Sequence, residues 1–257
     1  MFQAAITLPN GRPMLIRKQR LPWAQRRIHG RSAAAERHGA DQPRQHSQQW
    51  NEPPEATMAP TLVGDLRCPG GAQGLVILCH GSGSSSASPR NRAVARHLRQ
   101  AGLATWLLDL NTAPALPTVL RAIDSAQRDP HLAALPVALF GASSGAALAL
   151  QAAAERPERV RAVVSRGGRP DLAQHCLAQV RCPVLLLVGE HDRQVLELNR
   201  QAAAQLRADH QLLLIPGAGH LFEEPGCLEA VADLSSRWLL QTICRTDPQS
   251  AAEALKL

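Results

Sequence analysis

Residues Pro136–Leu150, PVALFGASSGAALAL, contain the pattern from which the fold of this 257-residue chain is most directly inferred. The apolar run Val137–Phe140 has the length of a buried strand, and the Ala- and Leu-rich run from Ala146 is typical of a helix. Between them, Gly141–Gly145 has the form G-x-S-x-G. Glycines at both ends allow the strand and the helix to approach closely, and the hydroxyl of Ser143 then projects above the edge of the sheet. We therefore interpret the stretch as a strand, a sharp turn and a helix.

The chain from Thr61 onward repeats this alternation of short apolar runs and helical patterns. The runs predict strands over 61–67, 74–80, 104–110, 137–140, 160–165, 183–189 and 211–215, with helices between them and a last helix over 226–242. This rhythm predicts an α/β fold with a doubly wound, mostly parallel sheet. Ligands of such sheets bind beyond the carboxyl ends of the strands.

Charge and composition argue against several classes of protein. Residues 1–57 carry nine Lys or Arg against four Asp or Glu, whereas the other 200 residues carry nineteen against seventeen. The predicted domain is thus nearly neutral, and the whole chain has only seven aromatic residues that could stack on bases, so we do not expect a nucleic-acid partner. No apolar run is long enough to span a membrane.

The six cysteines contain no C-x-x-C pair, which argues against a zinc site and a disulfide framework. Cys79 and Cys182 lie in or beside apolar runs and are expected to be small core residues. A reducing compartment, the cytoplasm, fits this cysteine usage best.

Residues 1–57 differ from the rest of the chain in composition. They hold six Pro and seven Gln, and they show no sustained periodicity. We expect a disordered basic extension or leader over 1–57, one domain over 58–244 and a short tail over 245–257.

An activated serine needs a base, and the base needs a group that orients it. His220 lies in the small-residue loop that follows the last predicted strand, and Asp192 follows the strand 183–189. Glu190 competes with Asp192 for the orienting role, but the chain order Ser143, Asp192, His220 is the one expected on such a sheet. The predicted catalytic residues are therefore Ser143, Asp192 and His220.

The tetrahedral intermediate of acyl transfer also needs two N–H donors for its oxyanion. The backbone N–H of Ser144, directly after the nucleophile, is one candidate. The backbone N–H of Ser82, in the loop after the strand 74–80, is the other. His80, at the start of this loop, is expected to brace it rather than to take part in the chemistry.

Two arginine-containing stretches point towards the same edge of the sheet. Arg90 and Arg92 begin the first predicted helix, and Arg166 and Arg169 flank a Gly-Gly turn. They are either solvated and locally hydrogen-bonded, or they form a rim that recognises a carboxylate or phosphate on the substrate. Phe222 is the aromatic candidate for a substrate contact, whereas Trp106 is expected in the core.

With these residues identified, residues 61–241 resemble the α/β-hydrolase superfamily, and within it the small, lidless dienelactone-hydrolase-like family, including a branch joined to phosphoribosyltransferase domains. The stretches that carry the resemblance are HGSGSS with SPRNR (80–92), FGASSGAA (140–147), VSRGGRPDLA (164–173), LLLVGEHD (185–192) and PGAGHLFEEPG (216–226). Dienelactone hydrolases use a cysteine nucleophile, whereas this chain has Ser143, which argues against dienelactone itself as substrate.

The resemblance implies hydrolysis of an ester, lactone or thioester through an acyl-serine, with no cofactor and no metal. The expected partner is a small acyl substrate, anionic if the arginines recognise it, and the expected protein is a monomer or homodimer. Two alternatives stay open at this point: a non-catalytic scaffold that uses the same fold for binding, and an acyltransferase that uses the same acyl-serine.

Overall fold

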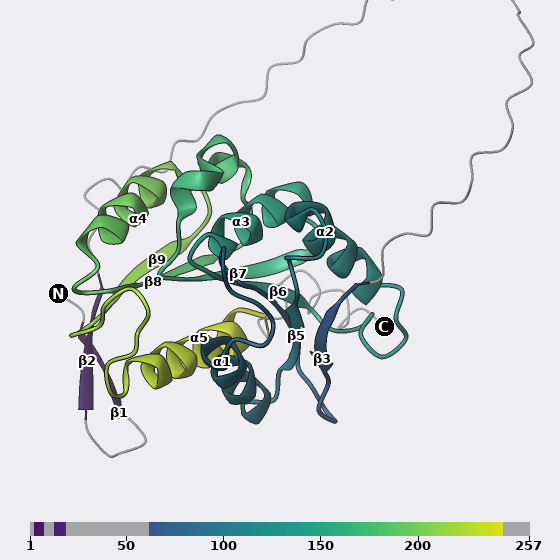
Figure 1. The fold of residues 1–257 in the computed structure, drawn as a ribbon, viewed down its shortest axis with the longest axis horizontal. Helices are drawn as coiled ribbons and strands as arrows, with labels where there is room; N and C mark the ends of the chain where they lie inside the picture. Colours follow the sequence, from purple (N-terminus) through teal and green to yellow (C-terminus); the bar gives the residue numbers. More distant parts are fainter. Residues whose placement is uncertain (1–2, 8–12, 19–61, 244–257) are drawn as a thin grey trace, which may run out of the picture. The chain divides into compact units, whose positions relative to one another are not determined.

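The structure of the protein is a computed structural model that describes residues 3–7, 13–18 and 62–243, the first two ranges as backbone alone. The described strands form one sheet in the order β1-β2-β9-β8-β7-β6-β4-β5-β3, covered by helices (Figure 1). The strands are β1 (Gln3–Thr7), β2 (Pro13–Lys18), β3 (Gly64–Arg67), β4 (Leu75–Cys79), β5 (Ala104–Leu108), β6 (Val137–Ala142), β7 (Val160–Arg166), β8 (Val184–Gly189) and β9 (His210–Ile215). The helices are α1 (Pro89–Gln100), α2 (Ala115–Ala126), α3 (Gly145–Glu155), the 3₁₀ segment η1 (Pro170–Gln179), α4 (Arg193–Gln205) and α5 (Cys227–Ile243).

Six neighbouring strands, β5, β4, β6, β7, β8 and β9, are parallel. At one edge β3 pairs antiparallel with β5, and at the other β2 pairs antiparallel with β9. The predicted doubly wound, mostly parallel α/β sheet is therefore confirmed.

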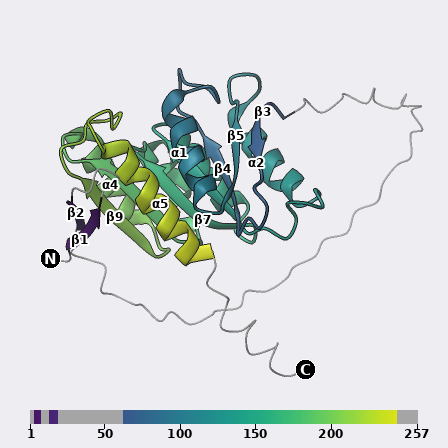
Figure 2. The same ribbon diagram turned by 90° about the horizontal axis from the view of Figure 1, so that it is seen from below.

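The parallel strands are buried on both faces, because their side chains alternate between two apolar layers. In β4, Leu75, Ile77 and Cys79 belong to one buried cluster, and Val76 and Leu78 belong to the other. The first cluster packs under α2, α3 and α4, and the second packs under α1 and α5, which run along the opposite face (Figures 1 and 2).

The strands β1 and β2 differ from the prediction that residues 1–57 lack regular structure. They pair with each other over five residues each, and β2 pairs with β9 at Arg17 and Lys18. The edge strand β9 offers unpaired backbone groups, which a second strand can satisfy without a long apolar run. The other residues of the predicted extension, and the predicted tail 245–257, lie outside the described residues, so the domain boundaries stay a prediction.

The connections between strands in residues 62–243 consist of single helices or loops, and no lid domain is inserted there, as predicted. In this described part of the chain, no helix combines the length and the apolar composition that crossing a membrane requires.

Candidate active site

The turn after β6 holds Ser143 in a left-handed backbone conformation, with φ of 52°. Non-glycine residues adopt this region at a cost, and it persists only where neighbouring groups fix it. Here the N–H of Ser143 donates to the carbonyl of Arg166 at 3.1 Å, and the N–H of Arg169 donates to the carbonyl of Ser143 at 3.0 Å. The end of β7 and the loop after it thus hold both backbone groups of the serine in place.

The two glycines of the pentapeptide are required by close approach. A Cβ at Gly141 would lie 2.3 Å from Cα of Ala146, and a Cβ at Gly145 would lie 2.2 Å from the carbonyl oxygen of Cys79. The strand and the helix therefore meet at a distance that only glycine permits, as the sequence pattern indicates.

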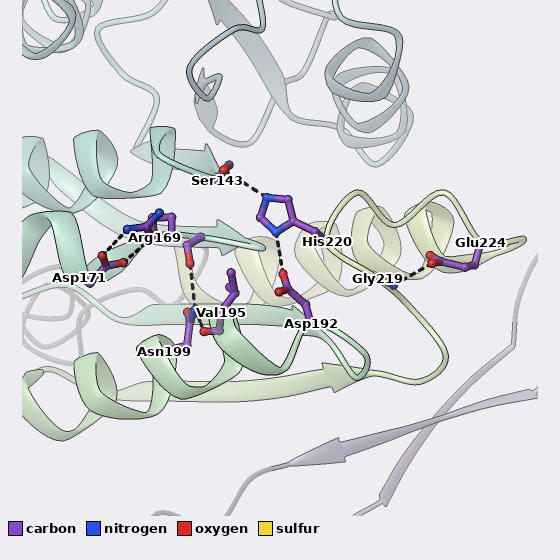
Figure 3. A network of polar contacts seen from close by, with 10 residues as sticks. Ser143, Arg169, Asp171, Asp192, Val195, Asn199, Gly219, His220 and Glu224 are labelled. Atoms are coloured by element: carbon purple, nitrogen blue, oxygen red, sulfur yellow. Dashed lines mark hydrogen bonds and ion pairs between the residues drawn. The ribbon is translucent and has the colours of Figure 1, made fainter.

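Ser143, His220 and Asp192 form a chain of hydrogen bonds (Figure 3). Oγ of Ser143 lies 3.3 Å from Nε2 of His220, and Nδ1 of His220 lies 2.6 Å from Oδ2 of Asp192. When Nδ1 carries the proton and donates to the carboxylate, Nε2 is free to accept from the serine hydroxyl. The structure thus brings together the three predicted catalytic side chains, which lie 28 to 77 residues apart in the chain.

The carboxylate that meets His220 is that of Asp192 and not that of Glu190. Asp192 occupies the residue before α4, and its side chain is 13% exposed. The carboxylate of Glu190 instead accepts the N–H of Gly217 at 3.2 Å and supports the loop that leads to His220. Glu224 supports the same loop, because its Oε1 accepts the N–H of Gly219 at 2.9 Å (Figure 3).

Ser82 and Ser144, whose backbone N–H groups are the predicted oxyanion donors, are in direct contact. The sequence does not reveal this contact. The N–H of Ser82 donates to Oγ of Ser144 at 2.8 Å, and the two hydroxyl oxygens are 3.1 Å apart. The hydroxyl of Ser144 thus lies next to the backbone N–H of Ser82. The N–H of Ser82, a predicted oxyanion donor, already has a hydrogen-bond acceptor in this arrangement.

His80 is 5% exposed and is hydrogen-bonded at both ring nitrogens. Its Nδ1 donates to the carbonyl of Gly81 at 2.9 Å, and its Nε2 accepts the N–H of Leu110 at 2.9 Å. This pairing fixes the start of the Ser82 loop to the end of β5, in agreement with the bracing role expected of His80.

The four arginines of the predicted rim have different surroundings. Arg169 forms a two-pronged ion pair with Asp171, at 2.9 and 2.8 Å, which lowers the pKa of that carboxyl. Arg90 pairs with Glu223, and Arg92 is exposed. Arg166 is 8% exposed and has no carboxylate partner among the described residues.

Phe222 is 1% exposed and belongs to the buried cluster under α1 and α5. Its backbone has φ of 56°, and its ring packs within the core next to Gly167. The structure therefore gives Phe222 a packing role, and its contact with substrate stays a prediction. Trp106 is 8% exposed and lies in the core, as expected.

The sequence reasoning missed Asn199, which is fully buried on α4 (Figure 3). Its Nδ2 donates to the carbonyls of Gly168 at 2.9 Å and Val195 at 2.8 Å, and it thereby ties the loop that holds Ser143 to the helix that follows Asp192. Asn199 lies four residues after Val195, so the helical period places both on the buried face of α4. A polar amide on an otherwise apolar face is the signal that could have revealed this role.

Comparison with known proteins identifies the family to which this chain belongs. The model of the dienelactone hydrolase family matches residues 91–239. The chain is 48% identical over 200 residues to two putative phosphoribosyl transferases of Mycobacterium tuberculosis, from strains CDC 1551 / Oshkosh and ATCC 25618 / H37Rv. The match covers 73% of this chain and 45% of each relative, so the chain spans less than half the length of these curated relatives.

Solved structures agree with the family match. A dienelactone hydrolase from Anabaena variabilis is 48% identical, with a TM-score of 0.69, over 70% of this chain and 92% of that one. A monoacylglycerol lipase from Paleococcus ferrophilus shares the fold at 19% identity and a TM-score of 0.59, over 71% of this chain and 99% of that one. The chain belongs to the dienelactone hydrolase family.

Proposed function

We propose that the protein is a serine hydrolase that cleaves an ester, lactone or thioester through an acyl-serine intermediate. The observation that carries the proposal is the chain of hydrogen bonds from Ser143 through His220 to Asp192. Membership of the dienelactone hydrolase family supports hydrolysis as the class of reaction.

In the proposed first half-reaction, Oγ of Ser143 attacks the acyl carbon while Nε2 of His220 takes the hydroxyl proton. The carboxylate of Asp192 holds the imidazole in the required tautomer and stabilises its cation. When the tetrahedral intermediate collapses, the bond to the leaving group breaks and His220 returns the proton to that group.

The negative charge of the intermediate is assigned to the N–H groups of Ser144 and Ser82. Both lie at the carboxyl edge of the sheet, and that of Ser144 also lies at the start of α3, where the helix dipole favours negative charge. In the second half-reaction His220 takes a proton from water, the hydroxide attacks the acyl carbon, and Ser143 leaves with the proton. No cofactor enters these steps.

The left-handed conformation of Ser143 supports an enzyme rather than a non-catalytic scaffold. A scaffold has no need for a strained serine aligned with a histidine and a carboxylate. Acyl transfer to an alcohol or amine uses the same acyl-serine and differs only in the acceptor. The two reactions separate when a low concentration of an acceptor such as methanol competes with water, because a transferase then forms mainly the methyl ester and a hydrolase mainly the free acid.

The proposal is tested with the purified protein on para-nitrophenyl butyrate, a simple lactone and an acyl thioester. We expect hydrolysis of at least one class and its loss in Ser143→Ala and His220→Gln. Wild-type turnover in Ser143→Ala would contradict the assignment of the nucleophile.

A further inference from the structure

The backbone N–H of Ser144, to which the oxyanion is assigned, shares one peptide group with the carbonyl of Ser143. That carbonyl accepts two hydrogen bonds, from the N–H of Arg169 at 3.0 Å and from the N–H of Ala146 at 3.1 Å. Because a trans peptide group is planar, its C=O and its N–H point in opposite directions. The groups that donate to the carbonyl of Ser143 therefore fix the direction in which the N–H of Ser144 points.

The N–H of Arg169 belongs to a second peptide group that is fixed in the same way. The carbonyl of this group is that of Gly168, and it accepts Nδ2 of Asn199 at 2.9 Å (Figure 3). A continuous chain of hydrogen bonds thus leads from the amide of Asn199, through two peptide groups, to the N–H of Ser144. Each hydrogen bond in such a chain polarises the next one, which makes the last N–H a stronger donor.

The packing around Gly168 holds the second peptide group in its place. Gly168 is buried, and a Cβ there would lie 1.9 Å from Oγ of Ser165 and 2.6 Å from Cβ of Ala146. The N–H of Gly167, the preceding residue, donates to the carbonyl of Leu187 at 2.8 Å. The loop thus lies directly against β7 and the start of α3, so a change at Asn199 is transmitted to the loop rather than absorbed by free space.

The surroundings of Asn199 indicate that its amide is retained for its donors. The side chain is fully buried, and Nδ2 donates to two carbonyl oxygens, those of Gly168 at 2.9 Å and Val195 at 2.8 Å. Its Oδ1 is buried as well and has no hydrogen-bond partner in the described part of the chain. A buried polar atom without a partner lowers the stability of a fold, so packing alone would favour an apolar side chain at this position.

We propose that Asn199 is a positioning residue for the oxyanion: through the peptide group that follows Gly168, it orients and polarises the N–H of Ser144. The inference rests on the proposed function, because it requires that an oxyanion forms at the acyl carbon attacked by Ser143. It also gives α4 two roles, since Asp192 is the residue before this helix and Asn199 lies within it.

The test uses two substrates that differ in one atom, para-nitrophenyl butyrate and its thiono analogue, in which sulfur replaces the carbonyl oxygen. Sulfur is a weak hydrogen-bond acceptor, so the oxyanion donors favour the oxygen ester much more than the thiono ester. The measured quantity is the ratio of kcat/KM for the oxygen ester to kcat/KM for the thiono ester. A change that only reduces the amount of folded enzyme slows both reactions equally and leaves this ratio at its wild-type value.

Two variants remove the donor to Gly168. Asn199→Leu has a similar shape and no donor, whereas Asn199→Thr keeps a hydroxyl that bonds the carbonyl of Val195, four residues earlier, and is too short to reach Gly168. We expect both variants to lower the ratio by about 5- to 50-fold, a part of the roughly 100- to 1,000-fold that the loss of one oxyanion donor costs.

Ser235→Ala is the matched control for the loss of a buried hydrogen bond on a helix. Ser235 is fully buried on α5, and its Oγ donates to the carbonyl of Val231, four residues earlier, at 2.6 Å. Asn199 makes the same kind of contact to Val195. Because Ser235 is not part of the chain of hydrogen bonds to Ser144, its replacement should leave the ratio at the wild-type value.

Two results would overturn the inference. In the first, the Asn199 variants fold and keep the wild-type ratio, which would leave the amide with a structural role alone; Asn199→Thr decides the matter if Asn199→Leu does not fold. In the second, Ser235→Ala lowers the ratio as much as they do, which would mean a general loosening of the fold. Failure of the proposed function is recognisable separately, because the wild-type protein would then neither hydrolyse the oxygen ester nor be labelled by a fluorophosphonate.

Discussion

Substituting Gly141 by alanine tests the geometry of the turn without touching any proposed catalytic side chain. The added Cβ would lie 2.3 Å from Cα of Ala146, 2.5 Å from the carbonyl oxygen of Gly145 and 2.6 Å from N of Ala146. All three are backbone atoms, so no side chain can rotate away. Ordinary contacts begin at 3.4 Å, so the first turn of α3 must move by about 1 Å relative to β6.

That displacement has two measurable consequences. Overpacking of this kind lowers the free energy of unfolding by about 1–3 kcal/mol, which is about 2–12 °C in Tm for a domain of this size. It also moves the N–H of Ser144 away from the acyl group, and a misplacement of about 1 Å slows a reaction about 100-fold. We therefore expect Gly141→Ala to label with a fluorophosphonate about 100-fold more slowly than wild type.

The assay follows the rate of labelling by intact mass and the unfolding by calorimetry. Gly70→Ala is the matched control, because a Cβ at Gly70 would have no atom within 4 Å, and it should change neither quantity. Wild-type labelling and an unchanged Tm in Gly141→Ala would refute the close strand–helix contact on which the site rests.

Three further predictions concern individual side chains. Asp192→Asn should lower kcat by about 100- to 10,000-fold because the imidazole loses its orienting carboxylate, whereas Glu190→Gln should lower it less than about tenfold; equal losses would contradict the assignment. Ser144→Ala keeps both backbone donors, so ester hydrolysis should stay within about tenfold of wild type; a loss comparable to that of Ser143→Ala would make the hydroxyl part of the chemistry. The ion pair with Arg156 lowers the pKa of Asp124, and Asp124→Asn breaks that pair. Because the folded pKa lies below the unfolded value of 3.8, the pair stabilises the fold above pH 3.8. The Tm difference between wild type and Asp124→Asn should therefore shrink as the pH falls through the folded pKa, and a pH-independent difference would contradict this account.

The sheet and the order of the site residues could be predicted because both depend on local patterns. Runs such as Val184–Gly189 are apolar at every position and are bounded by turn residues, which identifies buried parallel strands. The carboxyl ends of parallel strands share one edge, so side chains that follow β6, β8 and β9 must meet there. The meeting of Ser143, Asp192 and His220 follows from this topology and not from their separation in the chain.

Contacts that depend on side-chain direction were not predictable in the same way. Glu223 meets Arg90 across 133 residues, and nothing in either local pattern favours that pair over a solvated carboxylate. Phe222 lies two residues after the proposed base, yet its backbone is left-handed and its side chain is buried in the core. The strands β1 and β2 are short and lie in a segment whose average composition is polar, so only pairing with β9 reveals them.

The central claim, an activated serine at position 143, is tested most directly by the intact mass of the purified protein before and after a fluorophosphonate probe. The account predicts one adduct on the wild-type protein and none on Ser143→Ala. An unmodified wild-type protein that is folded by calorimetry, or an adduct that persists in Ser143→Ala, would contradict it.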